Sequence, residues 1–539
     1  MTLVRIKKVS THMRKFLIIL LAAISTLTFS QELEKSNKYL TDFEYLVEEL
    51  IETHPDPYTG FGGQIEFYRK KMDVENLISD SLTNDEFVIL INQFLSNLKD
   101  GHTSLYFPKN ESIGSKVLPL QLKISSDNIF VENTTKEYEN LIGSSITEIN
   151  GISVEKWLLK AKSFLPSENV SGAYYNLVKI ITDYQLAQKF FDCSSALEIT
   201  FSNNPNDKFS KIIPFQEQAS FPNRKSKIKS DNDNGLLYFS MIGKNKDIGY
   251  LAWNSILSRE VVENTYKNSP NLIQGNLNWA YGYLNEKQTG NIEKDISRVP
   301  SLYEQFYELS EKMSEKNSKY LIIDLRENSG GMTPIINPLL YKLYGDKYLN
   351  FDFEAEMIRR ISPLYLQKIG FNNIDDFNKA YNLNFKIGDY TFGSFGNVYP
   401  NLSIEQKREM LRRGYNGFGA DYLKKTEPMS NVEIFVLCSP KTFSAAYHFT
   451  YFLKRLGRTK IVGVAPRQAG NAFMETTNLT LPETKIEGSI SNSKQILFEE
   501  NSQSAEILKP DYEMTWQDFK KYGFDRNSEL IKTLELIDN

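Results

Sequence analysis

Two stretches of the sequence, YLIIDLRENSGG (Tyr320–Gly331) and IFVLCSPKTFSAAYHF (Ile434–Phe449), decide the expected fold. Each opens with an apolar run of the kind that forms a fully buried strand. The first run leads into Asp324, Arg326 and a Gly-Gly pair, and the second leads into a turn that ends at Ser444, before a helical pattern. At the N-terminus of a helix, free backbone N–H groups favour negative charge. The two stretches together predict a nucleophile beside an oxyanion hole.

These stretches resemble motifs of the tail-specific (C-terminal processing) serine peptidases, family S41. DLRENSGG is similar to the Asp-Leu-Arg signature of that family, and TFSAAYHFTYFLKRLGRTKIVG is similar to its nucleophile helix. LKDGHTSLYF (Leu98–Phe107) resembles the family's Asp-Gly-His-Thr motif, and GSSITEINGISVEKW (Gly143–Trp157) resembles the end of its PDZ-like domain. The resemblance implies a multidomain α/β protein with an N-terminal helical region, a PDZ-like domain and a ClpP/crotonase-like catalytic core with a mixed sheet.

The length and the periodicity of the chain fit this organisation. A chain of 539 residues is too long for one core. Apolar residues recur at helical spacing near the N-terminus, short strand patterns follow, and strand–helix–strand alternation begins near residue 245. The expected division is a signal peptide at 1–30, a helical region at 31–113, a PDZ-like domain at 115–215, and a catalytic domain at 235–530 with insertions at 258–300 and 345–428. The second insertion is either a lid over the site or a surface elaboration.

The composition narrows the classes of partner. The net charge of −4 is small for this length, so neither nucleic acid nor an anionic membrane surface is indicated. Two cysteines and four histidines, none at ligand spacing, predict no metal site, and the chemistry needs no cofactor. Because Cys438 lies within an apolar run, both cysteines are expected to be free rather than paired. The expected partner is a peptide or protein substrate, and the oligomeric state stays open.

The first 30 residues have the pattern of a secretory signal. Positive charges precede an apolar run, Phe16–Phe29, and Ser30-Gln31 is suited to cleavage. The run is short for a membrane span, and the rest of the chain has no second apolar stretch of comparable length. This predicts a periplasmic or secreted protein without a stable membrane span. The alternative is an uncleaved N-terminal anchor.

Ser444 is the candidate nucleophile. The alternative is an ordinary N-cap, for which serine is a preferred residue. Ala445 and Ala446 leave space around the hydroxyl, and the N–H of Ala445 is a natural oxyanion donor because it follows the nucleophile. The resemblance implies that an N–H of Gly330 or Gly331 completes the oxyanion hole, and it leaves Asp324 and Arg326 as structural residues of the same turn.

The general base is harder to assign. Many members of the family use a lysine after the nucleophile helix, but that position falls on Ala469 here, and the nearby Arg467 stays protonated. In the tricorn-like branch a histidine of the N-terminal motif is the base, which corresponds to His102, although a structural role is the alternative. His54 precedes a proline and suits a turn, and His448 lies one turn beyond the serine.

A third residue should orient the histidine. The tricorn-like branch uses a late glutamate, so Glu506 is the tentative acid, with Asp511 as the alternative. Tyr447 stands where the family usually has a glutamate. The sequence therefore predicts an exported serine peptidase that forms an acyl-enzyme on Ser444 with His102 as base. The competing interpretation is a non-catalytic peptide- or ligand-binding protein on the same fold.

Overall fold

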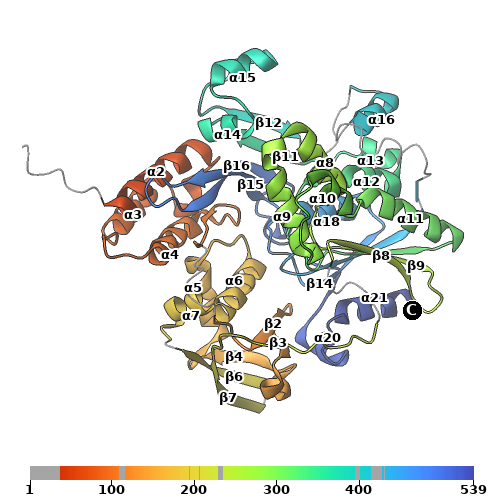
Figure 1. The fold of residues 1–539 in the computed structure, drawn as a ribbon, viewed down its shortest axis with the longest axis horizontal. Coiled ribbons are helices and arrows are strands. Elements are labelled where there is room, and N and C mark those ends of the chain that lie inside the picture. The colour runs from red at the N-terminus through yellow and green to blue at the C-terminus, as the bar shows by residue number, and fades with distance from the viewer. Residues whose placement is uncertain are drawn as a thin grey trace, which may run out of the picture.

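The computed structural model describes residues 37–108, 116–193, 195–204, 207–228, 235–394, 401–413, 428–429 and 431–538. The predicted signal peptide, residues 1–30, lies outside these described residues. Within the described ranges, no helix combines the length and the apolar character needed to cross a membrane. The chain folds as several α/β units, with the helical N-terminal region, the middle domain and the larger core side by side (Figure 1).

A six-stranded sheet forms the centre of the core, in the order β17-β14-β13-β10-β9-β8. All neighbouring pairs are parallel except β8 and β9, so the sheet is mixed, as the sequence predicts. β10 and β13 lie side by side, with Asp324 opposite Leu437, so the turns that follow both strands leave the sheet at the same edge. The strands are β8 (Leu237–Ile242), β9 (Ile248–Trp253), β10 (Tyr320–Asp324), β13 (Glu433–Cys438), β14 (Thr459–Gly463) and β17 (Tyr512–Glu513).

Helices supply most of the remaining core. Val262, Leu277 and Ile296, on three helices of the predicted insertion 258–300, are buried in the same apolar cluster as Trp253. That segment therefore forms part of the core, because its polar residues hide an apolar face at helical spacing. The helices are α8 (Arg259–Asn268), α9 (Ile273–Leu284), α10 (Ile292–Arg298), α11 (Leu302–Glu315), α12 (Asn337–Tyr344), α13 (Asp346–Asn350), α16 (Ile404–Arg413), α18 (Ala445–Leu456), α20 (Trp516–Lys521) and α21 (Ser528–Asp538).

The N-terminal helices pack against a second sheet. Thr83 begins one of these helices with a capping box to Glu86. Leu479 and Ile490 of the sheet share an apolar cluster with Phe43 and Phe94 of the helices. The helices are α2 (Lys38–Thr53), α3 (Gln64–Glu75) and α4 (Asn84–Leu95). The antiparallel sheet contains β1 (Ser104–Leu105), β11 (Glu356–Arg360), β12 (Tyr390–Ser394), β15 (Ala472–Thr480) and β16 (Glu487–Ile496), and the segment between β11 and β12 carries α14 (Pro363–Lys368) and α15 (Ile374–Tyr381).

The middle domain has its own antiparallel sheet, in the order β2-β3-β4-β6-β7, and its own apolar cluster around Trp157 and Phe190. We call it the β2–β7 domain; its assignment as PDZ-like, residues 115–215, stays a prediction. Its strands are β2 (Leu120–Ile124), β3 (Ile129–Thr134), β4 (Ser145–Ile149), β5 (Ile152–Ser153), β6 (Ala196–Asn204) and β7 (Asp207–Pro214). Its helices are α5 (Val154–Phe164), α6 (Val170–Thr182) and α7 (Tyr184–Phe191).

Candidate active site

Ser444 occupies a strained turn between β13 and α18. Its backbone has φ 52° and ψ −124°, a positive-φ conformation that is unusual for a residue with a side chain. Such strain persists only where the surroundings hold it, and it is concentrated at functional sites. Here the Ser444 N–H donates a hydrogen bond to Oε1 of the buried Gln468, which fixes the turn. The serine is half-buried at the start of the helix.

The turn after β10 packs directly against this serine. A Cβ placed on Gly330 would lie 2.7 Å from Cβ of Ser444 and 3.1 Å from the backbone nitrogen of Ala445, so only glycine fits. The Gly330 N–H is already bound to Oδ1 of Asn328 at 2.8 Å. Among the described residues, no group accepts a hydrogen bond from the N–H of Gly331 or of Ala445. Of the three predicted oxyanion residues, Gly331 and Ala445 therefore have the available donors, and Gly330 supplies the space.

His102 lies against the residue that precedes the serine. Its ring stacks on the ring of Phe443, with centroids 4.4 Å apart and an interplanar angle of 23°. Only 9% of the His102 side chain is exposed, and its Nδ1 lies 3.3 Å from Oε1 of Glu168. Both ring nitrogens are buried, and neither makes a hydrogen bond of regular geometry among the described residues, so Nδ1 approaches Glu168 at ion-pair distance only. The imidazole thus has a carboxylate on its Nδ1 side and no described partner on its Nε2 side.

Glu168 is the carboxylate that sequence reasoning missed. It lies in the loop between α5 and α6, and its buried carboxylate accepts hydrogen bonds from the N–H of Gly101 at 3.2 Å and of Ala469 at 2.8 Å. Burial raises the pKa of Glu168, although His102 opposes that effect. Burial by itself would lower the pKa of His102, but the ion pair with Glu168 outweighs it, so the pKa of His102 is raised above its usual value.

A second carboxylate, Asp100, supports the His102 segment from behind. It is fully buried, and its oxygens accept hydrogen bonds from the His102 N–H and from the Thr103 hydroxyl. His54 contacts the same carboxylate, with Nε2 3.4 Å from Oδ2. Because Nδ1 of His54 accepts the N–H of Asp56, its proton must lie on Nε2. Burial opposes the charge on Asp100, but the contact with His54 and these hydrogen bonds outweigh it and lower its pKa to about 2.

The other predicted residues are placed elsewhere. His448 is buried, where its ring nitrogens contact Thr333 and Gln495, and burial lowers its pKa to about 4. Glu506 ends the short helix α19 (Gln503–Glu506) with an exposed side chain, and no contact joins its carboxylate to His102 among the described residues. Asp511 accepts the N–H of Ile461 and pairs with Lys454, which makes it part of the sheet edge. The structure therefore brings Glu168, and neither Glu506 nor Asp511, to the histidine.

Ala469 has a backbone role at the position where many relatives have a lysine, because its N–H holds Glu168. The Tyr447 side chain is fully buried, and burial raises its pKa, so it remains a neutral core residue. Asp100, His102 and Glu168 have ligand atoms within 4.8 Å of one another, the spacing of a metal site. Their oxygens, however, already accept protein hydrogen bonds. This arrangement suits proton transfer better than metal binding.

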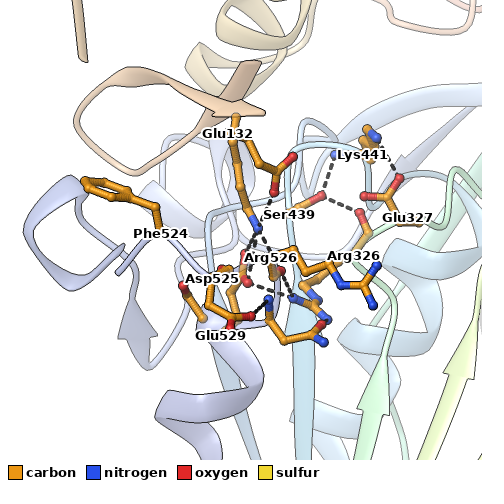
Figure 2. Close-up of polar contacts among 12 residues, drawn as sticks. Glu132, Arg326, Glu327, Ser439, Lys441, Phe524, Asp525, Arg526 and Glu529 are labelled. Atoms are coloured by element: carbon orange, nitrogen blue, oxygen red, sulfur yellow. Dashed lines mark hydrogen bonds and ion pairs between the residues drawn. The ribbon is translucent and has the colours of Figure 1, made fainter. Parts of the chain in front are cut away.

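An ion-pair network fixes the turn after β10 from its far side. Arg326 binds Asp324 through two nitrogens and Glu529 of α21 through Nη1 at 2.7 Å. Lys123 of β2 lies 3.0 Å from the same Glu529, so one buried carboxylate joins the β2–β7 domain to the catalytic turn (Figure 2). Ser439, which follows β13, donates a hydrogen bond to the carbonyl oxygen of Arg326. Asp324 and Arg326 thus have the structural role that the sequence predicts. Cys193 and Cys438 are both free thiols, also as predicted.

The chain is similar to one protein family by sequence and to several solved structures by fold. The model of Peptidase family S41 matches residues 281–514, and no curated protein matches the chain by sequence. Mature CPAF has a solved structure that is 15% identical with a TM-score of 0.55, covering 93% of this chain and 98% of that one. The structure of mature CPAF complexed with lactacystin is also 15% identical, with a TM-score of 0.54, covering 92% of this chain and 98% of that one. A putative S41 protease from Bacteroides fragilis is 13% identical, with a TM-score of 0.37, over 86% of this chain and 91% of that one.

The CPAF structures share the fold over nearly the whole chain, and the family match covers the strands and turns that carry Ser444 and Gly331. Residues 281–514 are therefore similar to the serine peptidases of family S41.

Proposed function

We propose that the protein hydrolyses peptide bonds through an acyl-enzyme in which Ser444 is the nucleophile, His102 the general base and Glu168 the residue that orients His102. The observation that carries this proposal is the environment of His102. Its Nδ1 faces a buried carboxylate, its Nε2 is unpaired among the described residues, and its ring stacks on the neighbour of a strained serine. This is the nucleophile–base–acid order that serine hydrolases require.

In the acylation step, Oγ of Ser444 forms a bond to the substrate carbonyl carbon while its proton passes to Nε2 of His102. The carbonyl oxygen becomes an oxyanion, which the N–H groups of Gly331 and Ala445 receive. Glu168 stabilises the imidazolium that forms. The C–N bond then breaks as His102 returns the proton to the leaving amine. In deacylation, His102 takes a proton from water, the hydroxide attacks the ester, and Ser444 leaves with the returned proton.

The histidine rather than a lysine is the base in this scheme. Ala469 cannot accept a proton, and Arg467 stays charged. This assignment places the chain nearer the histidine-using, tricorn-like branch of the family than the Ser-Lys branch. Glu168 comes from the β2–β7 domain, whereas the resemblance places the acid late in the chain, at Glu506.

The test is a peptide-library digest combined with labelling by a fluorophosphonate probe. Wild type should cleave a subset of peptides and take up the probe at Ser444. Ser444→Ala should do neither. Near wild-type turnover in His102→Ala would refute the assigned base. A wild type that binds peptides but shows neither cleavage nor labelling would support the competing function, a non-catalytic binding protein.

We also propose that the β2–β7 domain binds an extended end of the substrate chain. Among the described residues β2 pairs with β3 alone among the strands, so its other edge can accept a further strand. That edge borders a cavity of about 360 Å³ between the domain, the Arg326 turn and α21. Tyr175 and Val178 of α6 supply apolar wall, and Arg224 supplies positive charge, whereas Lys123 is paired with Glu132 and Glu529 in the same lining.

This second proposal is tested by affinity rather than by turnover. Ser444→Ala protein is titrated with one peptide that has a free C-terminus and with its amidated form. Capture of the terminal carboxylate predicts weaker binding of the amide. Equal affinity of the two peptides would leave the domain as a structural spacer.

The third proposal is export. It depends on the signal-like residues 1–30 of the sequence, and it predicts a mature protein in the periplasm or medium that begins near Gln31. N-terminal sequencing of the native protein provides the check. Recovery of an intact Met1 or Met13 terminus in the membrane fraction would point to an anchored form.

A further inference from the structure

A second cavity, of about 430 Å³, opens beside the candidate nucleophile. Phe443 forms part of its wall, and Glu168 reaches it from the loop before α6. The cavity therefore adjoins both the serine turn and the acid of the proposed triad. Its walls come from the β1 segment, the β2–β7 domain and the loop after β14, including Tyr106, Asn176, Lys179 and Arg467.

Arg467 is the central charged residue of this cavity. Its guanidinium lies between two aromatic rings, 4.3 Å from the centroid of Tyr175 and 4.3 Å from that of Phe443. Its Nη1 donates hydrogen bonds to the carbonyl oxygens of Pro440 and Lys441, at 3.0 and 2.9 Å. No described residue accepts a hydrogen bond from its Nε or Nη2, and neither atom is among the fully buried unpaired ones. A rigidly held guanidinium thus keeps two donors for a ligand.

The charges around the cavity favour an anion. No described carboxylate lies within ion-pair distance of Arg467 or of Lys179, which is exposed at the rim. The one acidic residue of the lining, Glu168, is occupied by His102 and by two backbone N–H groups. Two cations therefore line a cavity of mixed polarity in which Glu168, the one carboxylate among its described lining residues, is already used. A carboxylate is the ligand that matches a fixed guanidinium fork.

We propose that Arg467, with Lys179 at the rim, forms a subsite that binds a carboxylate of the substrate close to the bond that Ser444 cleaves. The carboxylate comes from an acidic side chain or from the end of the substrate chain, since both present the same two oxygens. This inference rests on the proposed peptidase function and adds a substrate class to it: peptides with a negative charge near the cleaved bond.

The test compares matched quenched-fluorescence peptides by their kcat/KM. In one series a single Glu or a Gln is moved through the positions on either side of the cleaved bond. In the other, cleavable peptides end in a free or an amidated C-terminus. Wild type should favour the acidic member of at least one pair by about tenfold, the usual size of a charge-assisted hydrogen bond. In Arg467→Met this ratio should fall to within about twofold, whereas Arg467→Lys should keep part of it.

The ratio of kcat/KM for the acidic peptide to kcat/KM for its neutral partner separates this role from a structural one. Damage to the serine turn would lower kcat/KM for both peptides of a pair and leave their ratio unchanged. Lys162→Met is the matched control: it removes one positive charge from an exposed position on α5 outside the cavity lining, and it should leave the ratio unchanged. If Arg467→Met does not fold, Lys179→Gln must lower the ratio instead.

The outcomes separate the two proposals. Cleavage by wild type without any acid preference, or with a preference that survives both Arg467→Met and Lys179→Gln, overturns the subsite while the peptidase function stands. A loss of preference in the Glu/Gln series alone assigns the site to an acidic side chain, and a loss in the terminus series alone assigns it to the chain end. A wild type that cleaves nothing and takes up no probe overturns the peptidase function and, with it, the subsite.

Discussion

Replacing Glu168 by glutamine isolates the electrostatic part of the proposed triad. Glutamine has nearly the same shape, and its carbonyl oxygen can still accept a hydrogen bond from Nδ1 of His102 and from a backbone N–H. What disappears is the negative charge 3.3 Å from the imidazole. His102 must be neutral to accept the serine proton, so kcat/KM should rise with pH through the pKa of His102. Because Glu168 raises that pKa, its removal should move the rise to lower pH.

The size of the shift follows from the distance. Two opposite unit charges 3.3 Å apart attract each other by about 5 kcal/mol at an effective dielectric constant of about 20, which is a ceiling. Measured shifts from a neighbouring opposite charge are about 1–3 in pKa. The apparent pKa should therefore fall. The same lost attraction, about 1.4–4 kcal/mol, acts on the imidazolium of the transition state and predicts a plateau kcat/KM about 10- to 1,000-fold lower.

The assay is a pH profile of kcat/KM on one cleavable peptide for wild type, Glu168→Gln and Glu506→Gln. Thermal unfolding of each variant shows whether the fold is kept. Glu506→Gln is the comparison because its carboxylate is exposed and has no contact with His102 among the described residues. An unchanged profile in Glu168→Gln, together with a large loss in Glu506→Gln, would refute the assigned acid and restore the alternative drawn from the family resemblance.

Three further predictions concern the residues around the site. Gly330→Ala should lower kcat/KM by at least about 100-fold and also lower Tm, because the new methyl group would lie 2.7 Å from Cβ of Ser444 and the backbone has a positive φ; a rate and a Tm near wild type would show that the turn can move. Glu529→Gln should lower the free energy of unfolding in urea by about 3–5 kcal/mol, since it leaves Arg326 buried without one of its partners; a loss below about 1 kcal/mol would make the network dispensable. Asp100 has a folded-state pKa of about 2, below its unfolded value, so its ionised form stabilises the fold by about 2–3 kcal/mol above pH ~4. This stabilisation is lost as the pH falls towards 2. The free energy of unfolding of Asp100→Asn, measured over the same pH range, should lack that dependence.

The sequence predicts the parts of the protein that depend on local patterns. The two buried strands, β10 and β13, and the turns after them are visible because apolar runs and small residues follow one another within a few positions. Ser444, Gly331 and Ala445 lie in those turns, so the candidate oxyanion site could be proposed before the fold was known. His102 was found through a motif in the family resemblance rather than through its surroundings.

Glu168 could not be found in this way. It lies 67 residues from Gly101 in the chain, in a loop whose acid before a helix looks like ordinary helix-start chemistry. Its role depends on how the β2–β7 domain docks on the core, which periodicity does not report. The glycine of the Asp-Gly-His motif is a related signal in the sequence. A Cβ at Gly101 would lie 2.9 Å from Oε1 of Glu168, so the close approach of this carboxylate explains why a residue without a side chain is found there. The second sheet was missed for a similar reason, because β1 has two residues and pairs with distant β16.

The carboxylate of Glu529 has a consequence for the order in which the protein is made. It is 203 residues from Arg326 and 406 from Lys123 in the chain, so both partners leave the ribosome long before it does. Until α21 docks, the guanidinium beneath the oxyanion turn lacks one of its counter-charges, and contacts of such long sequence separation form late. A growing chain already carries Ser444 and His102 at that stage, but the turn that must receive the oxyanion is not yet held. The turn after β10 is therefore expected to reach its final arrangement only once α21 has docked.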